Sequence, residues 1–402
     1  MIKKYIIETL KWSGISALTG VSVGLVGIAF HWTLEQVREI QTAHHWVVWF
    51  LSLAGLAIVF LYKILGFKKD DGTNAVLKSA QTGEKVTIRM TIAIFISTAL
   101  THLFGGSAGR EGAALQIGGS IANKIGRSIH LSKDDMRMIT VCGMGAGFSA
   151  LFGTPATSTV FALEIANTGE MCYPALLPCM ISSVVASSLA KCFGFAPTAF
   201  LITEYPEISV ENFIRVALLA FVVAFVAMLF YHSTDFAKEF FQKKFKNPYI
   251  RIVVGGVIIS LLSPIFSYVY NGAGTDTIVS AFQGQVGMEK FLLKIIFTAI
   301  TLGSGFKGGE IVPTLFIGST FGSAFAWVFG LNPSFSAGIA MIAMFCGVTN
   351  CPIASMVLAV ELFANGKSIS FFIIACAISY AFSGKLGLYS AQKIFHKGKL
   401  EI

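Results

Sequence analysis

The sequence contains few charged residues. Asp, Glu, Lys and Arg make up only 13% of its 402 residues, whereas 54% are hydrophobic. A soluble globular domain carries about 25% charged residues, so this chain lacks the charge to cover a water-facing surface. Its cysteines stand singly, without CxxC spacing, which argues against metal or redox chemistry, and we expect no metal or cofactor. We expect the cysteines to be small packing residues: Cys142, Cys172, Cys179, Cys192, Cys346, Cys351 and Cys376.

Apolar runs follow one another along nearly the whole chain. They lie at residues 15–32, 46–65, 90–106, 113–126, 138–153, 157–166, 175–195, 213–232, 252–270, 291–303, 311–330, 335–347, 353–364 and 368–384. Helices satisfy their own backbone hydrogen bonds in lipid, so the pattern predicts an all-α polytopic membrane protein. The loops are too short for a soluble domain, and we expect a single membrane domain over 1–402 with no soluble regulatory domain. The segment Met1–Trp12 indicates a basic amphipathic helix and does not resemble a cleaved signal peptide.

The net charge of +9 comes from basic residues that lie between or beyond the apolar runs. They are Lys3, Lys4, Lys11, Lys68, Lys69, Lys393, Lys397, Lys399 and the cluster from Lys238 to Arg251. Such placement is typical of cytoplasmic loops, and it favours membrane lipid over nucleic acid as the surrounding partner. We therefore expect a multi-pass protein of the plasma membrane with cytoplasmic termini. The acidic linker with Glu204, Glu207 and Glu211 would face outside.

An internal repeat organises the chain. At an offset of 200 residues, GGSAGREGAALQIGGSIA (105–122) aligns with GFKGGEIVPTLFIGSTFG (305–322); at an offset of 197, Phe148, Pro155 and Glu164 align with Phe345, Pro352 and Glu361. The charges that flank 15–32 and 213–232 are reversed, which predicts that the halves, about 12–195 and 205–388, are inverted in the membrane. We expect them to superpose by a rotation of nearly 180° about an axis in the membrane plane. Glu164 and Glu361 are interpreted as structural capping residues.

Several runs are too short to be complete spans. The runs at 113–126, 157–166 and 353–364 fall below the roughly 20 residues that a span needs, and Gly or Pro stands near their starts. This predicts broken helices that meet around a cavity. Helix N-termini offer unpaired N–H groups and about half a positive charge each, so several together make an anion site. The candidate starts are Gly72-Thr73-Asn74, Gly109-Arg110-Glu111-Gly112 and Gly309-Glu310-Ile311-Val312-Pro313.

Glu111 is the carboxylate expected to act. A charged group at such a depth costs on the order of 2.5–3.5 kcal/mol. When charged, Glu111 could occupy an anion position on the same amides; when protonated, it would leave that position. One residue can therefore serve as both gate and proton carrier. The alternative is a structural glutamate satisfied by backbone groups at a helix start.

These motifs resemble those of the CLC family of chloride channels and proton-coupled anion antiporters. GREGAALQIGGSIA is similar to its GREGP block, GGEIVPTLFIG to its GxFxP block, and GKLGLYSA (384–391) to its terminal segment with a pore tyrosine. The resemblance covers residues 12–392 and implies a CLC-like inverted repeat and a homodimer with one pathway in each subunit. It implies that Glu111 is the gating glutamate and Tyr389 the inner-gate tyrosine. It also implies that the amides of Ile311 and Val312 are anion ligands, beside Thr73, Asn74, Gly109, Arg110 and Gly112 of the other helix starts.

The departures from the family pattern concern the ion. Thr73 stands where the family's central serine falls, Ala113 replaces the proline of GREGP, and Ile311 replaces the phenylalanine of GxFxP. Ile165 stands in place of the internal proton glutamate of the chloride antiporters. The substituted serine and missing glutamate are similar to the bacterial fluoride/proton antiporter branch. We therefore expect a proton-coupled antiporter that exports fluoride in exchange for protons. A chloride/proton antiporter or a passive chloride channel of the same family is the alternative.

Two short motifs of the sequence could instead indicate an enzyme. Gly105-Gly106-Ser107-Ala108-Gly109 is formally a GxSxG nucleophile pattern, which makes an intramembrane serine protease a remote alternative. Its serine requires a base within reach, and His102 is the histidine within the interior of the runs. Asp70-Asp71 is a lone acidic pair, so a metal-dependent membrane prenyltransferase is disfavoured and solvated loop aspartates are expected. We do not expect an enzyme.

Overall fold

The computed structural model describes residues 2–67, 71–363, 368–384 and 387–394. Lys68, Lys69, Asp70, Lys397 and Lys399, which figured in the charge pattern, lie outside the described residues. The first helices along the chain are α1 (Ile2–Ala43), α2 (Leu51–Ile64), α3 (Thr73–Thr82), α4 (Arg89–Leu103), α5 (Glu111–Ser128), α6 (Lys133–Phe152), α7 (Pro155–Glu164) and α8 (Leu176–Cys192).

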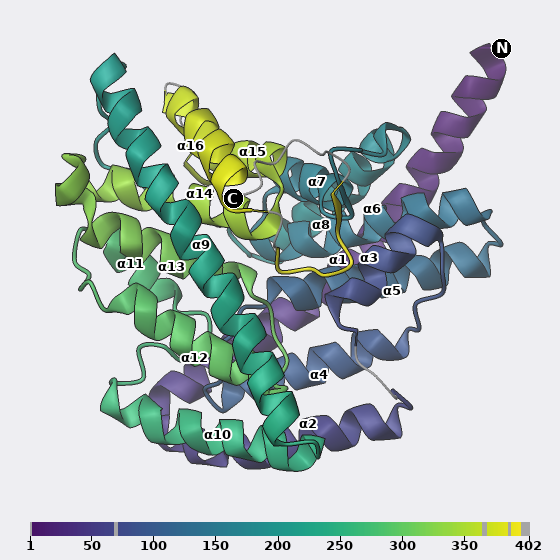
Figure 1. The fold of residues 1–402 in the computed structure, drawn as a ribbon. Helices are drawn as coiled ribbons and strands as arrows, with labels where there is room; N and C mark the ends of the chain where they lie inside the picture. The colour runs from purple at the N-terminus through teal and green to yellow at the C-terminus, as the bar shows by residue number, and fades with distance from the viewer. Residues whose placement is uncertain (1, 68–70, 364–367, 385–386, 395–402) are drawn as a thin grey trace.

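The second series of helices follows the linker after α8 (Figure 1). It consists of α9 (Val210–Lys244), α10 (Pro248–Ile265), α11 (Thr275–Phe282), α12 (Lys290–Ser304), α13 (Ile311–Ala324), α14 (Pro333–Thr349), α15 (Pro352–Phe363) and α16 (Ile369–Phe382). Short 3₁₀ turns are η1 (His45–Phe50), η2 (Tyr173–Ala175) and η3 (Ala326–Phe329). Two strands of two residues, β1 (Asn167–Thr168) and β2 (Lys393–Ile394), pair in parallel.

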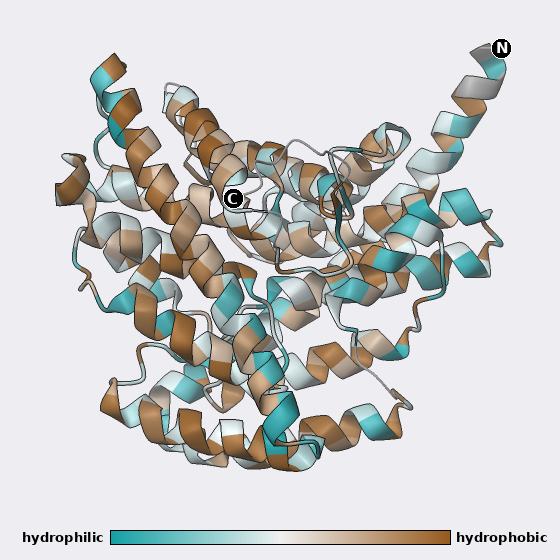
Figure 2. Cartoon of the chain, viewed as in Figure 1, coloured by the Kyte–Doolittle hydropathy of each residue, from teal (hydrophilic) through white to brown (hydrophobic). Residues whose placement is uncertain are grey.

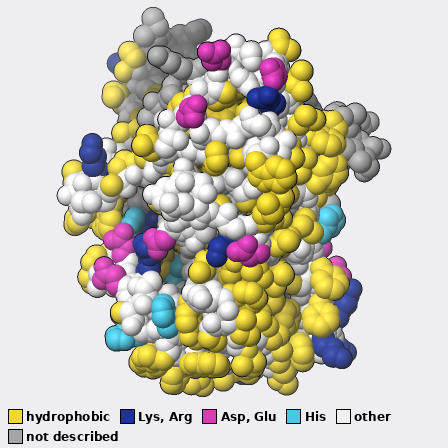
Figure 3. All heavy atoms as spheres, turned by 90° about the vertical axis from the view of Figure 1, so that its left-hand side faces the viewer, with side chains coloured by type: hydrophobic (Ala, Val, Ile, Leu, Met, Phe, Trp, Pro, Cys, Tyr) yellow, Lys and Arg dark blue, Asp and Glu magenta, His cyan; other side chains and the backbone are white. Residues whose placement is uncertain are grey.

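The all-α polytopic membrane fold is confirmed. Each predicted apolar run falls on a helix, and five helical stretches in the described residues are long and apolar enough to cross a membrane. Apolar residues dominate the outer faces of the helices (Figure 2), and hydrophobic side chains cover much of the face in Figure 3. Exposed apolar side chains are expected where the surrounding solvent is lipid. The apolar runs did not reveal α3 and α11, which are short and partly polar.

The two series of eight helices pack in matching pairs. Helix α1 packs on α6 and α8, whereas α9 packs on α14 and α16; likewise α5 packs on α6, and α13 on α14. The long helices α1 and α9 descend from opposite sides of the molecule (Figure 1). The short helices are equally matched, because α7 has 10 residues and α15 has 12. Helices at corresponding positions of the two series therefore have corresponding neighbours.

Glu164 and Glu361 cap each other's helices, as their interpretation as structural residues requires. Glu361, near the end of α15, accepts hydrogen bonds from the amides of Ala156 (3.0 Å) and Thr157 (2.7 Å) at the start of α7. Glu164, at the end of α7, accepts from Ile353 (3.2 Å) and Ala354 (2.8 Å) at the start of α15. A carboxylate is favourable at a helix N-terminus. The reciprocal bonds hold the two series of helices together.

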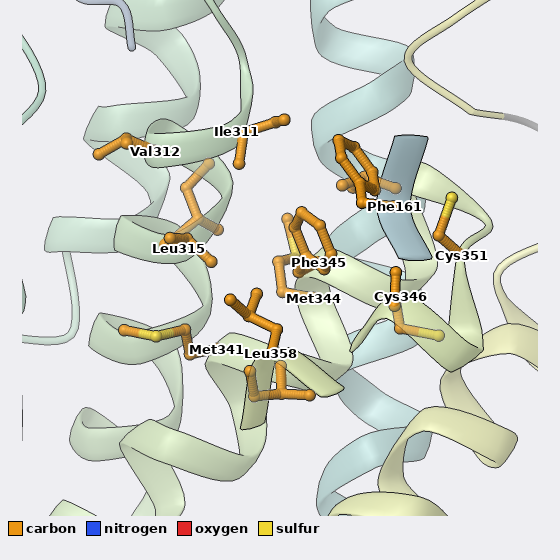
Figure 4. Packing of buried hydrophobic residues seen from close by; sticks show 14 of the residues in the cluster. Phe161, Ile311, Val312, Leu315, Met341, Met344, Phe345, Cys346, Cys351 and Leu358 are labelled. Carbon is orange, nitrogen blue, oxygen red and sulfur yellow. The ribbon is translucent and has the colours of Figure 1, made fainter. Parts of the chain in front are cut away.

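The largest hydrophobic core joins both series. Phe161 of α7 and Phe345 of α14 pack with ring centroids 5.4 Å apart, and Met344 lies beside Phe345 (Figure 4). The cysteines only partly match the expectation of packing residues. All seven are free, and five are buried, whereas Cys172 and Cys192 are exposed at the two ends of the α8 segment.

The segment after α16 returns to the centre of the molecule. Its β2 strand pairs with β1, and Gln81 Nε2 donates to the carbonyls of Ala166 and Ala391, both at 2.7 Å. The amide of Leu388 donates to the carbonyl of Val348 at 3.0 Å. These bonds fix the position of the intervening Tyr389, which is only 4% exposed.

Candidate anion and proton site

Two glycines join the broken helices α5 and α13 at the centre of the molecule. The amide of Gly109 donates to the carbonyl of Gly309 at 2.6 Å, and the amide of Gly309 donates to the carbonyl of Gly109 at 2.8 Å. A Cβ on Gly309 would lie 2.7 Å from the amide nitrogen of Gly112, so no larger residue fits this approach. The bridge brings the N-terminus of α5 against the N-terminus of α13.

The helix starts lack caps from their own N-cap side chains. Arg110 before α5, Glu310 before α13 and Gly72 before α3 make no side-chain capping hydrogen bond. Uncapped N-termini leave N–H groups that favour an anion. Gly72 has φ 53°, a conformation that glycine adopts without a Cβ clash, which explains the glycine at this start.

The carboxylate of Glu111 occupies these amides. Its Oε2 atom accepts hydrogen bonds from the amide of Arg110 at 2.9 Å and from the amide of Val312 at 3.3 Å. The residue is fully buried, and Oε1 has no hydrogen-bond partner within the described structure. Arg110 Nε lies 3.9 Å from Oε1. The carboxylate therefore stands where a bound anion would accept the same two hydrogen bonds.

Two cavities lie next to the residues around Glu111. The first, called here the Tyr389 cavity, has a volume of about 230 Å³, and its lining includes Thr73, Asn74, Gln116, Asp235, Lys238, Lys307, Glu310 and Tyr389. The second, called the Arg110 cavity, has a volume of about 350 Å³, and its lining includes Glu35, Arg38, His102, Arg110, Asp276 and Val312. Glu111 itself lines neither cavity. Its preceding residue Arg110 and its hydrogen-bond partner Val312 line the Arg110 cavity, whereas Glu310, two residues before Val312, lines the Tyr389 cavity.

Hydroxyl and amide groups form part of the lining of the Tyr389 cavity. Gln116 Nε2 donates to Thr73 Oγ1 at 3.1 Å and to the carbonyl of Gly112 at 3.2 Å. The hydroxyl of Tyr389 is buried and has no hydrogen-bond partner in the described part of the chain. Thr73 and Tyr389 thus line the same cavity.

Two of the predicted anion ligands, Gly109 and Asn74, use their backbone amides in hydrogen bonds within the protein. The amide of Gly109 is bonded to Gly309, and the amide of Asn74 donates to the carbonyl of Asp71 at 3.1 Å. Asn74 Oδ1 accepts from the amide of Ala391 at 2.9 Å, which ties α3 to the Tyr389 segment. These two backbone amides are not available to an anion, because each hydrogen is already donated to the protein. Asn74 still lines the Tyr389 cavity. Ile311 is fully buried at the first position of α13 (Figure 4).

Three residues of the site were not singled out from the sequence. Gln116 lies one helical turn after Gly112, and Glu310 lies in the same GGEIVP motif as the predicted amide ligands. The helix-start motif of α13 therefore contributes a second carboxylate, because Glu310 lines the Tyr389 cavity. The third is Lys294 of α12, which is fully buried. Its Nζ donates to the carbonyls of Tyr270 (3.1 Å) and Gly272 (2.7 Å), and of these two residues Gly272 lines the Arg110 cavity.

The residues that could indicate an enzyme make other contacts in the structure. Ser107 Oγ and Thr298 Oγ1 are 3.0 Å apart and share a hydrogen bond. His102 Nε2 lies 3.2 Å from the carbonyl oxygen of Gly109. Asp71, from the acidic loop pair, forms an ion pair with Lys78 at 3.0 Å. Neither arrangement is a catalytic pair or a metal site.

Comparison with known proteins gives one family. The model of the voltage-gated chloride channel family matches residues 54–384. The chain is 33% identical over 395 residues to a chloride/fluoride channel protein of Pseudomonas syringae, covering 96% of this chain and 87% of the relative. It is 25% identical over 405 residues to an H⁺/Cl⁻ exchange transporter, ClcA, of Vibrio cholerae, covering 93% and 86%.

Solved structures agree in fold. A crystal structure of a CLC-type fluoride/proton antiporter is similar with a TM-score of 0.93 and 30% identity, covering 96% of this chain and 99% of that chain. A slow cyanobacterial Cl⁻/H⁺ antiporter has a TM-score of 0.80 at 19% identity, covering 92% and 94%. The second likeness concerns the fold alone.

Proposed function

Because this chain belongs to the voltage-gated chloride channel (CLC) family, we propose that it is a proton-coupled antiporter that exports fluoride in exchange for protons. The observation that carries the proposal is the buried Glu111 carboxylate, which is held by the amides of Arg110 and Val312 and whose neighbours line two cavities. Fluoride can replace the carboxylate on those amides once Glu111 is protonated. The 30% identity to the structure of a fluoride/proton antiporter favours fluoride as the ion.

The exchange follows from competition for one position. A charged Glu111 occupies the amides and keeps an anion out. Protonation removes its charge, so that the side chain leaves and an anion binds. Return of the charged side chain displaces the anion, and the proton is released on one side. Alternation of the two occupants moves anions and protons in opposite directions.

The test is transport by the purified protein in proteoliposomes. We expect an outward fluoride gradient to drive proton uptake, recorded together by a fluoride electrode and a pH electrode. An equal chloride gradient should drive much less. Proton uptake driven by chloride but not by fluoride would replace the proposal with a chloride/proton antiporter. Anion efflux without proton movement would indicate a channel.

We place the Tyr389 cavity on the cytoplasmic side of a plasma membrane. Lys238, which lines it, begins the basic cluster that ends at Arg251, and basic residues favour the cytoplasmic side. The reversed flanking charges of the two series support an inverted repeat about an axis in the membrane plane. A cysteine introduced at Lys3, with Cys172 and Cys192 replaced, should resist a membrane-impermeant thiol reagent in intact cells. Labelling from outside would contradict cytoplasmic placement of that end.

We further propose a homodimer with a complete pathway in each subunit. Helices α8, α15 and α16 present exposed apolar side chains: Leu176, Leu177, Val184, Ile353, Val360 and Ile373. We expect the mass in detergent, corrected for bound detergent, to be twice the chain mass of 43.2 kDa. Cross-linking through cysteines placed at Val184 should give the same result. A monomer in both measurements would contradict the proposal.

Thr73 and Tyr389 should determine which anion moves. Each supplies one hydroxyl to the Tyr389 cavity, and small, strongly hydrated fluoride depends most on such donors. We expect Thr73→Val and Tyr389→Phe each to lower the ratio of fluoride to chloride flux by about tenfold, with protons still coupled. Tyr249→Phe at the start of α10, which lines neither cavity, is the control. An unchanged flux ratio in both variants would remove the two hydroxyls from the selectivity site.

A further inference from the structure

Gln116 has a polar atom that the exchange described above does not use. Buried side-chain atoms without a hydrogen-bond partner in the described residues include Glu111 Oε1, Tyr389 Oη and Gln116 Oε1. The first two belong to the gate and to the anion cavity. Gln116 is 3% exposed and lines the Tyr389 cavity. An unsatisfied buried acceptor is costly, so its persistence at this place calls for a ligand.

The surrounding bonds fix the orientation of the Gln116 amide. Its nitrogen lies 3.2 Å from the carbonyl oxygen of Gly112 and 3.1 Å from Thr73 Oγ1. A backbone carbonyl only accepts hydrogen bonds, so the amide nitrogen and not the oxygen must face Gly112. Both amide hydrogens are then used. The free atom of Gln116 is the acceptor Oε1.

This orientation also fixes the hydroxyl of Thr73. The hydroxyl accepts a hydrogen bond from Gln116, and its own hydrogen remains to be donated. Thr73 Oγ1 donates a long hydrogen bond of 3.4 Å to the carbonyl of Gly112, which also accepts from Gln116. An anion in the cavity can compete with this long bond for the hydroxyl hydrogen. Gln116 gives the site one donor, through Thr73, and one acceptor, through Oε1.

An acceptor beside an anion path has a defined chemical partner. The partial negative charge of Oε1 repels a bare anion, whereas a neutral molecule with a polarised hydrogen donates to it. Two such molecules fit the proposed exchange, namely water and hydrogen fluoride. Ile165 is fully buried in the place of a second proton-carrying glutamate, so protons need another means of crossing the space between the Tyr389 cavity and Glu111.

We propose that Gln116 Oε1 is the hydrogen-bond acceptor for the neutral proton-bearing molecule, water or hydrogen fluoride, that passes between the Tyr389 cavity and Glu111. The proposal rests on the proton-coupled antiport described above. In this step a proton moves between the bound molecule and the Glu111 carboxylate, whose O–H bond forms or breaks. Hydrogen fluoride that gives up its proton is left as fluoride, whereas water passes on one proton as it takes up another. Gln116 only binds and orients the molecule.

The experiment compares Gln116→Met, which removes both the donor and the acceptor at similar length, with Gln116→Glu, which keeps the acceptor. Proton uptake and fluoride efflux are recorded together in proteoliposomes, and thermal unfolding in detergent checks folding. We expect Gln116→Met to lower proton uptake by about tenfold at an unchanged unfolding midpoint, and Gln116→Glu to restore it. The wild type is measured first. If it shows no fluoride-driven proton uptake, the antiport function fails and not the role of Gln116.

The ratio of proton uptake to fluoride efflux shows whether water or hydrogen fluoride is the donor. If hydrogen fluoride is the donor, both fluxes fall together in Gln116→Met and both return in Gln116→Glu. If water is the donor, proton uptake falls more than fluoride efflux. Wild-type fluxes in Gln116→Met, or equal impairment of the two variants at an unchanged midpoint, would overturn the proposal. If Gln116→Met does not fold, Gln116→Glu alone decides, because loss of its proton uptake would contradict the acceptor role.

Discussion

Replacing Glu111 with glutamine should reduce fluoride-driven proton uptake to background, a loss of about 100-fold or more. Glutamine keeps the length of the side chain and one acceptor oxygen for the amides of Arg110 and Val312. It cannot carry a proton, and it has no charge with which to displace an anion. We expect residual fluoride movement without protons, or a stalled transporter in which the amide stays on its two donors. Simultaneous fluoride and pH recordings in proteoliposomes distinguish these results from the wild type.

Glu361→Gln is the matched control for this substitution. Glu361 is also a glutamate that accepts two backbone amides at a helix start, in this case those of Ala156 and Thr157. It lines neither cavity. Its replacement should lower the thermal stability and leave the ratio of protons to anions unchanged. Full exchange in Glu111→Gln, or loss of coupling in both variants, would contradict the assignment of Glu111 as gate and proton carrier.

Apolar runs predict most of the helices because lipid requires apolar outer surfaces and internally satisfied backbones. They do not predict α3 and α11, which have 10 and 8 residues and carry polar side chains. These helices lie against other helices rather than spanning lipid, so no long apolar window marks them. The glycine at Gly72 still indicated the start of α3. A glycine can therefore indicate the start of a helix at a sharp turn of the chain, even where the hydropathy pattern does not reveal that helix.

The site could be predicted in part. Glu111 can be recognised in the sequence because a carboxylate between apolar runs needs groups that stabilise its charge. The backbone amide of Val312 in α13 is one such group. The amide of Gly109 shows the limit of this reasoning, because its donation to Gly309 depends on a contact across two hundred residues of chain. Gln116 gave a weaker signal, since a single amide in a helix is unremarkable until its neighbours are known. Its free acceptor is visible only in three dimensions.

Glu310 provides the second large expected effect. It precedes the first residue of α13 and lines the Tyr389 cavity, which we place on the cytoplasmic side. Among the described residues, the other carboxylates of this lining are Asp71, which pairs with Lys78, and Asp235. Protons exchanged between Glu111 and this side must cross the region beside Glu310, because Oε2 of Glu111 is bonded to the amide two residues after Glu310. Glu310 is therefore the carboxylate placed to exchange protons between Glu111 and the cavity.

Glu310→Gln should lower proton uptake by about 100-fold, and fluoride efflux should fall with it. The reason differs from that for Glu111→Gln, because a charged Glu111 still occupies the amides and keeps anions out until it is protonated. The two substitutions thus separate the gate from the proton supply, since only Glu111→Gln can leave anion movement free of protons. Asp235→Asn, in the same cavity on α9, is the control and should stay within about twofold of the wild type. If Glu310→Gln keeps wild-type proton uptake while Glu111→Gln loses it, protons reach Glu111 by the Gln116 acceptor without a carboxylate. If Glu310→Gln instead leaves rapid fluoride efflux without protons, Glu111 is not the barrier between the two cavities.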